Sequence, residues 1–278
     1  EITTRLVGSE MCIRDSNNIW LGSIGGGVLM IDTKQSPFAF YSLNLAEDDV
    51  PTTAVRALFA DADKDLWLGT GSYGLARKDY ETGVLSFFSH IPEFSDIPSV
   101  PTVNYIIQRK NGEVWFATYD GGILIYEKGE KVKVLTESDT PYLYSDCVSA
   151  LCEDSKGNCW VGCRGGMGIS LADGGHYRFG TLSFAGGGLA DWYHVKDIVE
   201  DADGSFWIAT ANYGIIHIMG DVLHPETLKY SNYSYNNGQL ATNSVLCLHV
   251  DKSGRLWAGT EGGGLYLCLL YTSPSPRD

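Results

Sequence analysis

The chain has 278 residues, of which 44% are apolar, and a formal net charge of −14 at pH 7. This composition can bury a large core in one or two domains, and the acidity, with no basic block anywhere, excludes nucleic acid and anionic membrane surfaces as expected partners. The 33 glycines, 7 tryptophans and 16 tyrosines favour an all-β fold, because glycine serves tight turns and aromatic residues favour strands.

The two ends of the chain look like opposite strands of one DNA sequence. When Leu6–Ser16 is back-translated with one permitted choice of codons, the reverse complement reads as Cys268–Arg277, and a codon for Arg5 supplies Asp278. The DNA resembles the adapter of transposon-based sequencing libraries. We therefore interpret both ends as translated adapter, so that neither bears on a signal peptide, a membrane span or a further domain of the parent protein.

A block of 45 to 50 residues repeats between these ends. Six tryptophans, 47, 48, 45, 47 and 50 residues apart, occupy the same place in successive blocks. In chain order they are Trp20, Trp67, Trp115, Trp160, Trp207 and Trp257. Repetition at this period is typical of propellers and other repeat architectures. We interpret these six tryptophans as structural residues that pack one repeat against the next.

Each block predicts four strands in a fixed order. An apolar run such as VSALCE (148–153) is strand A, and a turn rich in Asp, Ser, Lys, Asn and Gly follows it. The tryptophan run, as in WIAT (207–210), is strand B, and a glycine-rich turn leads to strand C, as in GGLYL (263–267). Short aromatic runs supply strand D: FAFYS, VLSFFSH, KVKVL, HYRFG and LKYSNYS.

This order predicts the blade of a β-propeller, because four strands recur in roughly 40–50 residues. Strand B is apolar at successive positions, as expected where neighbouring blades cover both faces of a sheet. The predicted fold is all-β, a propeller fragment of about six four-stranded blades. The expected division is residues 1–16, adapter-derived; residues 17–267, the propeller, with incomplete first and last blades; and residues 268–278, adapter-derived.

The blocks resemble a known repeat. Their pattern, V-x-x-[IL]-x-x-D-x-x-G-x-[LF]-W-[IVLA]-[GA]-T-x-x-x-G-[LI], is clearest at 195–218 and 245–267 and is similar to the two-component regulator propeller repeat. Lys64 departs from the pattern at the turn glycine, Arg109 at the turn aspartate, and Cys163 at the threonine after strand B. Six tandem copies make the resemblance specific.

The resemblance implies the periplasmic sensor region of a bacterial inner-membrane histidine kinase, with seven blades in the parent ring. It implies an oligosaccharide or other small ligand that regulates the kinase and transcription, contact with the rest of the parent chain, and a homodimer formed through the parent. It implies no enzyme activity and no cofactor for this fragment. A protein-interaction scaffold and a propeller glycosidase or lyase are the rival interpretations.

A ligand is expected at the loops that join strand B to strand C and strand D to the next strand A, because both emerge on one face of a propeller. They offer aromatic planes and hydrogen-bonding groups, a mixture that suits a sugar. The candidate residues are Trp192, Tyr193, His194, Tyr73, Tyr119, Asp120, Arg164, Asn212, Tyr213, Glu261, Asn104 and Tyr105. Trp192, which lies outside the repeat series, has a rival interpretation as a plug over a blade edge.

Metal sites are not expected. The segments DADKD (61–65) and DADG (201–204) look like calcium loops, but they lack the terminal glutamate of an EF-hand and occupy turns. Cys152, Cys159 and Cys163 lack the spacing of a zinc site. We interpret these cysteines as buried apolar thiols.

Overall fold

The computed structural model of the chain describes residues 13–15, 18–23, 27–32, 36–41, 54–71, 73–179, 182–183, 189–190, 194–221, 224 and 227–268. The chain divides into two compact units, one of Glu1–Thr140 with Ser145–Val148 and the other of Pro141–Tyr144 with Ser149–Asp278. The helices that are described from end to end are two 3₁₀ turns. None of the described helices is long and apolar enough to cross a membrane.

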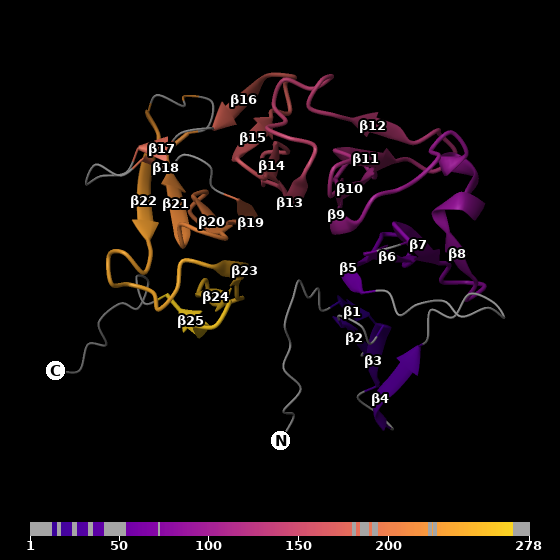
Figure 1. Cartoon of the computed structure of the whole chain (residues 1–278). Helices are drawn as coiled ribbons and strands as arrows, with labels where there is room; N and C mark the ends of the chain where they lie inside the picture. Colours follow the sequence, from indigo (N-terminus) through magenta and orange to yellow (C-terminus); the bar gives the residue numbers. More distant parts are fainter. Residues whose placement is uncertain are drawn as a thin grey trace. The chain divides into compact units, whose positions relative to one another are not determined.

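The first unit contains antiparallel sheets whose strands follow one another in chain order (Figure 1). One sheet consists of β5 (Val55–Ala60), β6 (Leu66–Thr70), β7 (Leu75–Lys78) and β8 (Leu85–Phe87). The next consists of β9 (Val103–Gln108), β10 (Val114–Thr118), β11 (Ile123–Tyr126) and β12 (Lys133–Leu135). A sheet of β1 (Ile13–Asp15), β2 (Asn18–Ser23), β3 (Gly27–Asp32) and β4 (Ser36–Tyr41) is described in its backbone alone.

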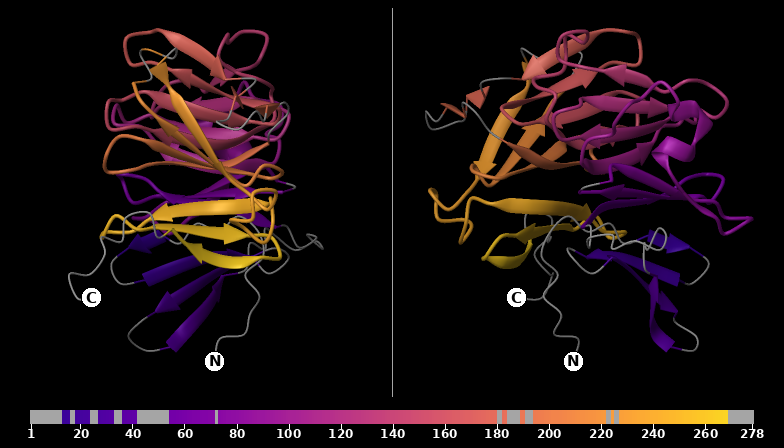
Figure 2. Two further views of the ribbon diagram at one scale, coloured as in Figure 1. Left: turned by 90° about the vertical axis from the view of Figure 1, so that its left-hand side faces the viewer. Right: turned by 45° about the vertical axis from the view of Figure 1, so that its right-hand side comes forward.

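The second unit repeats this arrangement, and Figure 2 shows the antiparallel strands of its last sheet. Its sheets are β13 (Val148–Glu153), β14 (Cys159–Cys163), β15 (Gly166–Ser170) and β16 (His176–Phe179); then β19 (Val195–Glu200), β20 (Phe206–Thr210), β21 (Ile215–Met219) and β22 (Lys229–Tyr233); then β23 (Val245–Val250), β24 (Leu256–Thr260) and β25 (Gly264–Leu267). A short pair, β17 (Leu182–Ser183) and β18 (Leu189–Ala190), was not foreseen from the sequence.

The all-β prediction is confirmed, whereas the predicted number and size of the blades are corrected. Five sheets with described side chains form blades, and the last of them, β23–β25, has three strands. The structure therefore shows five blades of three or four strands rather than about six four-stranded blades. The run VLSFFSH is also only half a strand, because β8 ends at Phe87 and a 3₁₀ turn, η1 (Phe88–His90), begins there.

The core of each blade lies around strand B. Every residue of β6, β10, β14 and β20 is buried, so these strands are covered on both faces. Trp67 is fully buried, and its ring centroid lies 5.1 Å from that of Phe116 in the next blade. In the second unit Trp160 contacts Phe206 in the same way, at 4.1 Å. These aromatic pairs stabilise the stacking of neighbouring blades inside each unit.

One carboxylate holds the A–B turn in four of the five blades. The aspartate six residues before the tryptophan accepts a hydrogen bond from the indole Nε1, over 2.8 to 3.2 Å. The pairs are Trp67–Asp61, Trp160–Asp154, Trp207–Asp201 and Trp257–Asp251. In three of these blades the other carboxylate oxygen accepts the backbone N–H two residues before the tryptophan. The aspartate thus joins the turn to the core of the blade.

The β9–β12 blade reaches the same result with different residues. Arg109 stands at the aspartate position, and the Trp115 Nε1 donates instead to Glu113 Oε2 at 3.0 Å. The Arg109 guanidinium lies 4.8 Å from the centroid of the Trp115 ring, a distance at which a cation and an aromatic face attract each other. The departure from the repeat pattern therefore preserves the indole hydrogen bond.

The turn glycine of the repeat is explained by its backbone angle. Gly112, Gly157, Gly204 and Gly254 all have positive φ, between 74° and 96°. Lys64 occupies the same place in the first described blade and also adopts a positive φ, of 68°. Because a residue with a Cβ atom rarely adopts this conformation, the turn geometry imposes a strain on Lys64 that glycine would not carry.

Candidate functional site

The B–C loops are shaped by a threonine at the end of strand B. In four blades its Oγ1 donates to the carbonyl of a glycine four residues later, at distances of 2.8 to 3.2 Å. In two of these loops the same hydroxyl accepts a backbone N–H, that of Tyr73 in one and that of Tyr213 in the other. In the β13–β16 blade, which has Cys163 at this position, Cys163 pairs with Gly166 and the turn shortens to Arg164 and Gly165.

Five predicted residues lie in the first unit. Tyr119 and Asp120 form the exposed tip of the loop after β10; Tyr119 is 44% exposed, and Asp120 adopts a positive φ of 66°. Asn104 and Tyr105 belong to β9 and are half-buried, and the Asn104 side chain donates to the Val148 carbonyl at 3.3 Å. Tyr73 is half-buried, and its ring packs edge-on against Phe87, with 6.1 Å between centroids.

Three predicted residues come together in the second unit. Arg164 and His194 form an isolated antiparallel bridge. The His194 backbone N–H donates to Asn212 Oδ1 at 3.3 Å, and the His194 carbonyl accepts the N–H of Ala211 at 2.9 Å. The side chains of Arg164 and Asn212 are exposed. Two B–C turns and the connection before β19 thus place an arginine, a histidine and an asparagine side by side.

His194 is uncharged at neutral pH. Burial lowers the pKa of His194 to about 4, and the positive charges of Lys196 and Arg164 add to the effect. A neutral imidazole offers one hydrogen-bond donor and one acceptor. The cluster therefore combines a cationic group with a neutral group that can both donate and accept.

The other predicted residues of the second unit stand apart from this cluster. Tyr213 is half-buried and packs against the core, and its carbonyl accepts a hydrogen bond from Asn232 Nδ2. Glu261 is exposed and accepts a hydrogen bond from Ser244 Oγ at 2.9 Å. Trp192 and Tyr193 lie outside the described residues, so the two interpretations of Trp192 stay predictions.

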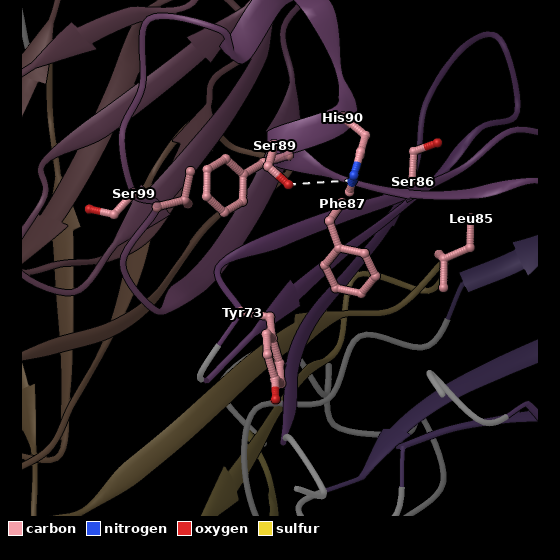
Figure 3. Close-up of a pocket in the computed structure, with 9 residues that line it drawn as sticks. Tyr73, Leu85, Ser86, Phe87, Ser89, His90 and Ser99 are labelled. Carbon is pink, nitrogen blue, oxygen red and sulfur yellow. Dashed lines mark hydrogen bonds between the residues drawn. The ribbon is translucent and has the colours of Figure 1, made fainter. Parts of the chain in front are cut away.

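A cavity that sequence reasoning missed opens next to Tyr73 (Figure 3). It has a volume of about 570 Å³ and lies between the loop after β6, the strand β8 with the η1 turn, and the segment that precedes β9. Only Tyr73 of the predicted set lines it. The run VLSFFSH supplies six of its lining residues, but the sequence carries no signal for the cavity, because the pattern of this run predicts a strand D like the others.

The described residues contain no cluster of three or more histidine, cysteine or acidic side chains that could hold a metal ion. Cys159 and Cys163 are buried on β14. Cys152 lies on β13, and burial raises the pKa of its thiol to about 12, with nearby carboxylates adding to the effect. This thiol is therefore protonated and a weak nucleophile at neutral pH.

The blades, with their tryptophan–carboxylate turns and threonine-clamped loops, define a β-propeller. The family model described as "Two component regulator propeller" matches residues 145–165 and 239–262. This match confirms the resemblance seen in the repeats. Histidine kinase P4 of Formosa agariphila is 25% identical over 175 residues, which are 60% of this chain. The chain spans only 12% of the length of that kinase.

Solved structures support the same fold. The extracellular domain of the hybrid two component system BT3049 from B. thetaiotaomicron matches with a TM-score of 0.71 and 19% identity, over 96% of this chain and 35% of that one. Virginiamycin B lyase from Staphylococcus aureus matches with a TM-score of 0.63 and 14% identity, over 96% of this chain and 85% of that one. At these identities the likeness establishes the β-propeller fold and leaves the chemistry to the site itself.

Proposed function

We propose that this chain is the ligand-sensing propeller region of a bacterial two-component sensor, and that it binds an oligosaccharide to regulate a kinase and transcription. The proposal is supported by the repeat match and by the similarity to a histidine kinase and to the extracellular domain of a two-component system. It includes a periplasmic location, linkage to the rest of the parent chain, and dimerisation through that parent.

The observation that carries this proposal is the chemistry of the B–C and D–A loops. In the first unit an exposed tyrosine, Tyr119, stands at the tip of a B–C loop. In the second unit Arg164, His194 and Asn212 come together from two B–C turns and the connection before β19. Aromatic faces can stack on the apolar face of a sugar ring, while amide, imidazole and guanidinium groups can hydrogen-bond its hydroxyls. Loops that carry both kinds of group suit an oligosaccharide better than a purely apolar or a purely anionic ligand.

Binding without turnover is part of the proposal. Some propellers with this fold are named as lyases, so the fold alone does not decide between a sensor and an enzyme. We assign the predicted site residues to recognition and none of them to catalysis. A scaffold for protein partners remains the alternative, with partner proteins rather than saccharides occupying the same loops.

The test is titration calorimetry of the full chain against neutral and acidic oligosaccharides, with product analysis after each titration. We expect saturable heat with at least one saccharide and no conversion of it. Tyr119→Ala should weaken that binding about tenfold, whereas Tyr80→Ala should not change it. Tyr80 is the matched control because it is 51% exposed but follows β7, on the opposite edge of a blade. Conversion of the saccharide would identify an enzyme instead.

We also propose that residues 1–16 and 268–278 derive from adapter DNA and that residues 17–267 are the native segment. The support is the reverse-complement relation between the two ends. Genomic reads that cover the codons of residues 17 and 267 should continue outward into sequence that differs from the codons of residues 1–16 and 268–278. Genomic reads that encode both ends as they stand would contradict this proposal.

A further inference from the structure

The cavity beside β8 has an apolar floor and a polar rim. Phe87 and Val100 are buried at its base, whereas Ser89, His90 and Ser99 are exposed around it. The Tyr73 ring lines the cavity beside Phe87, against which it packs edge-on with 6.1 Å between centroids (Figure 3). Its volume of about 570 Å³ lies within the range of small-molecule sites, roughly 300–1,000 Å³.

Hydrogen bonds within the loop after β6 fix the position of Tyr73 in the structure without a ligand. Thr70 Oγ1 accepts the Tyr73 N–H at 3.0 Å and donates to the Gly74 carbonyl at 3.2 Å. Gly74 has a φ of 64°, and a Cβ atom there would lie 2.5 Å from the Val100 carbonyl oxygen. The absence of a side chain at Gly74 is therefore what lets the two walls of the cavity approach each other.

The rim that carries Ser89 and His90 is also anchored. The η1 turn is followed directly by a second 3₁₀ turn, η2 (Pro92–Phe94), and backbone bonds from Ile91 to Phe88 and from Phe94 to Ile91 close the two turns. Ile91 and Phe94 are buried in the core that the two blades share. The double turn therefore holds Ser89 and His90 at the mouth, where Ser89 Oγ and His90 Nδ1 lie 3.4 Å apart.

The lining selects an uncharged ligand. None of the residues that line the cavity is an aspartate, glutamate, lysine or arginine, although 19% of the chain consists of these four types. A charged ligand entering such a site would lose its hydration without gaining a partner of opposite charge. An aromatic wall facing hydroxyl and imidazole groups instead matches a ring with one apolar face and several hydroxyls.

We propose that this cavity is a subsite for one uncharged sugar unit, stacked on Tyr73 and hydrogen-bonded by His90 and the serines of the rim. This inference rests on the proposed function and adds to it the position of one sugar unit and its lack of charge. It also predicts that the sensor discriminates against acidic sugars at this position.

The test is ligand-detected NMR of the full chain with cellotriose, maltotriose, laminaritriose and trigalacturonate. We expect at least one neutral trisaccharide to bind and trigalacturonate to bind at least tenfold more weakly. Tyr73→Ala should weaken the neutral ligand about tenfold, and Tyr73→Phe, which keeps the ring, by no more than about threefold. His90→Ala should weaken it about three- to tenfold. Tyr80→Ala is the control and should leave binding unchanged.

The outcomes separate this inference from the function on which it rests. If a neutral trisaccharide binds but His90→Ala and Tyr73→Ala bind it as tightly as the unaltered chain, the cavity is not the subsite, while saccharide sensing stands. Equal affinity for trigalacturonate would overturn the uncharged specificity. If no saccharide binds here or in the calorimetry, both proposals fail. His90 is exposed, so His90→Ala keeps the test valid even if Tyr73→Ala does not fold.

Discussion

The two edges of each blade follow different rules. On the edge that carries the A–B turn, the same hydrogen bond from tryptophan to carboxylate occurs in all five described blades. On the edge that carries the B–C loop, the threonine clamp occurs in four blades and Cys163 stands in its place in the fifth. The residues at the tip of this loop change from Tyr119 to Arg164 to Asn212. The uniform edge stabilises the fold, and the variable edge carries the side chains that we propose to recognise a ligand.

The comparison is informative because both edges are polar in sequence. Aspartate, asparagine and arginine occur on each, and composition alone cannot tell a structural carboxylate from one that binds a ligand. What separates them is burial. The Asp154 carboxylate is 2% exposed and accepts both an indole and a backbone N–H within its blade, whereas Tyr119 at the tip of a B–C loop is 44% exposed.

Loss of a buried repeat tryptophan should give the largest effect. Trp207→Ala should lower the free energy of unfolding by about 3–5 kcal/mol, because it removes a fully buried ring that stacks on His217 with centroids 3.7 Å apart. Trp257 is only half-buried, so Trp257→Ala should cost clearly less. Urea denaturation of both variants checks this order, and equal losses would contradict a role that depends on burial.

Loss of a turn carboxylate should come next. Asp154 is 2% exposed and accepts hydrogen bonds from the backbone N–H of Lys156 and Asn158, the Asn158 side chain and the Trp160 indole. Asp154→Ala should therefore cost about 2–3 kcal/mol in urea denaturation, since it leaves buried donors without an acceptor. Asp63→Ala, which removes an exposed ion pair with Lys128, should cost less than about 1 kcal/mol. If Asp154→Ala lowers the free energy of unfolding no more than Asp63→Ala does, the aspartate does not stabilise the A–B turn.

The β9–β12 blade offers a rescue experiment. Glu113→Ala should cost about 1–2 kcal/mol, because it removes the acceptor of the Trp115 indole. Adding Arg109→Asp should restore part of this loss, since it places an aspartate six residues before the tryptophan, as in the other blades. A double-mutant cycle in denaturant measures the recovery. If the free-energy changes of Glu113→Ala and Arg109→Asp simply add in the double variant, an aspartate at position 109 does not replace Glu113 as the acceptor.

The smallest effects should appear in the pH dependence of stability. Two aspartates that both stand six residues before a repeat tryptophan, Asp61 and Asp251, should contribute to stability with opposite pH dependences. Burial raises the pKa of Asp61, whereas the hydrogen bond from the Trp257 indole, with others from Arg255, holds the pKa of Asp251 well below its ordinary value of 3.8. The contribution of Asp251 is therefore present above pH 3.8 and should fade as the pH drops below it. The contribution of Asp61 should change in the opposite direction, growing as the pH falls through its raised pKa.

Thermal melts of Asp251→Asn and Asp61→Asn between pH 7 and pH 3 check these signs. The deficit of Asp251→Asn relative to the unaltered chain should shrink toward pH 3. The stability of the unaltered chain relative to Asp61→Asn should instead rise over the same interval. Parallel curves would contradict the opposite shifts in pKa.

The repeat period, the order of strands and the class of fold could be predicted from the sequence because they depend on patterns that recur. The strand B runs are apolar at successive positions up to a closing threonine or cysteine, and every residue of β6, β10, β14 and β20 is buried. The number of blades was predicted wrongly, because the six repeat tryptophans indicated about six blades, whereas five blades of three or four strands have described side chains. The role of Glu113 was also missed. It accepts the hydrogen bond of the Trp115 indole in place of the usual aspartate, and only the position of the indole in the structure shows this.

The candidate site was predicted less well, for a physical reason. Loop residues were chosen by their position after strand B or before strand A, which brings Arg164, His194 and Asn212 together but leaves Tyr213 packed on the core. The cavity beside β8 depends on a double 3₁₀ turn and on the close approach of Gly74 to Val100. Neither feature has a repeating signature, so only the structure could reveal it.

Hydrogen exchange of the full chain, with and without a saturating neutral trisaccharide, tests the division between the two edges most directly. The account predicts slower exchange in the loops after β6 and β10 and in the segment from η1 to β9. It predicts no change in the A–B turns at residues 61–65 and 109–113, whose hydrogen bonds are already complete. Slowing confined to those turns, or unchanged exchange throughout despite binding, would contradict it.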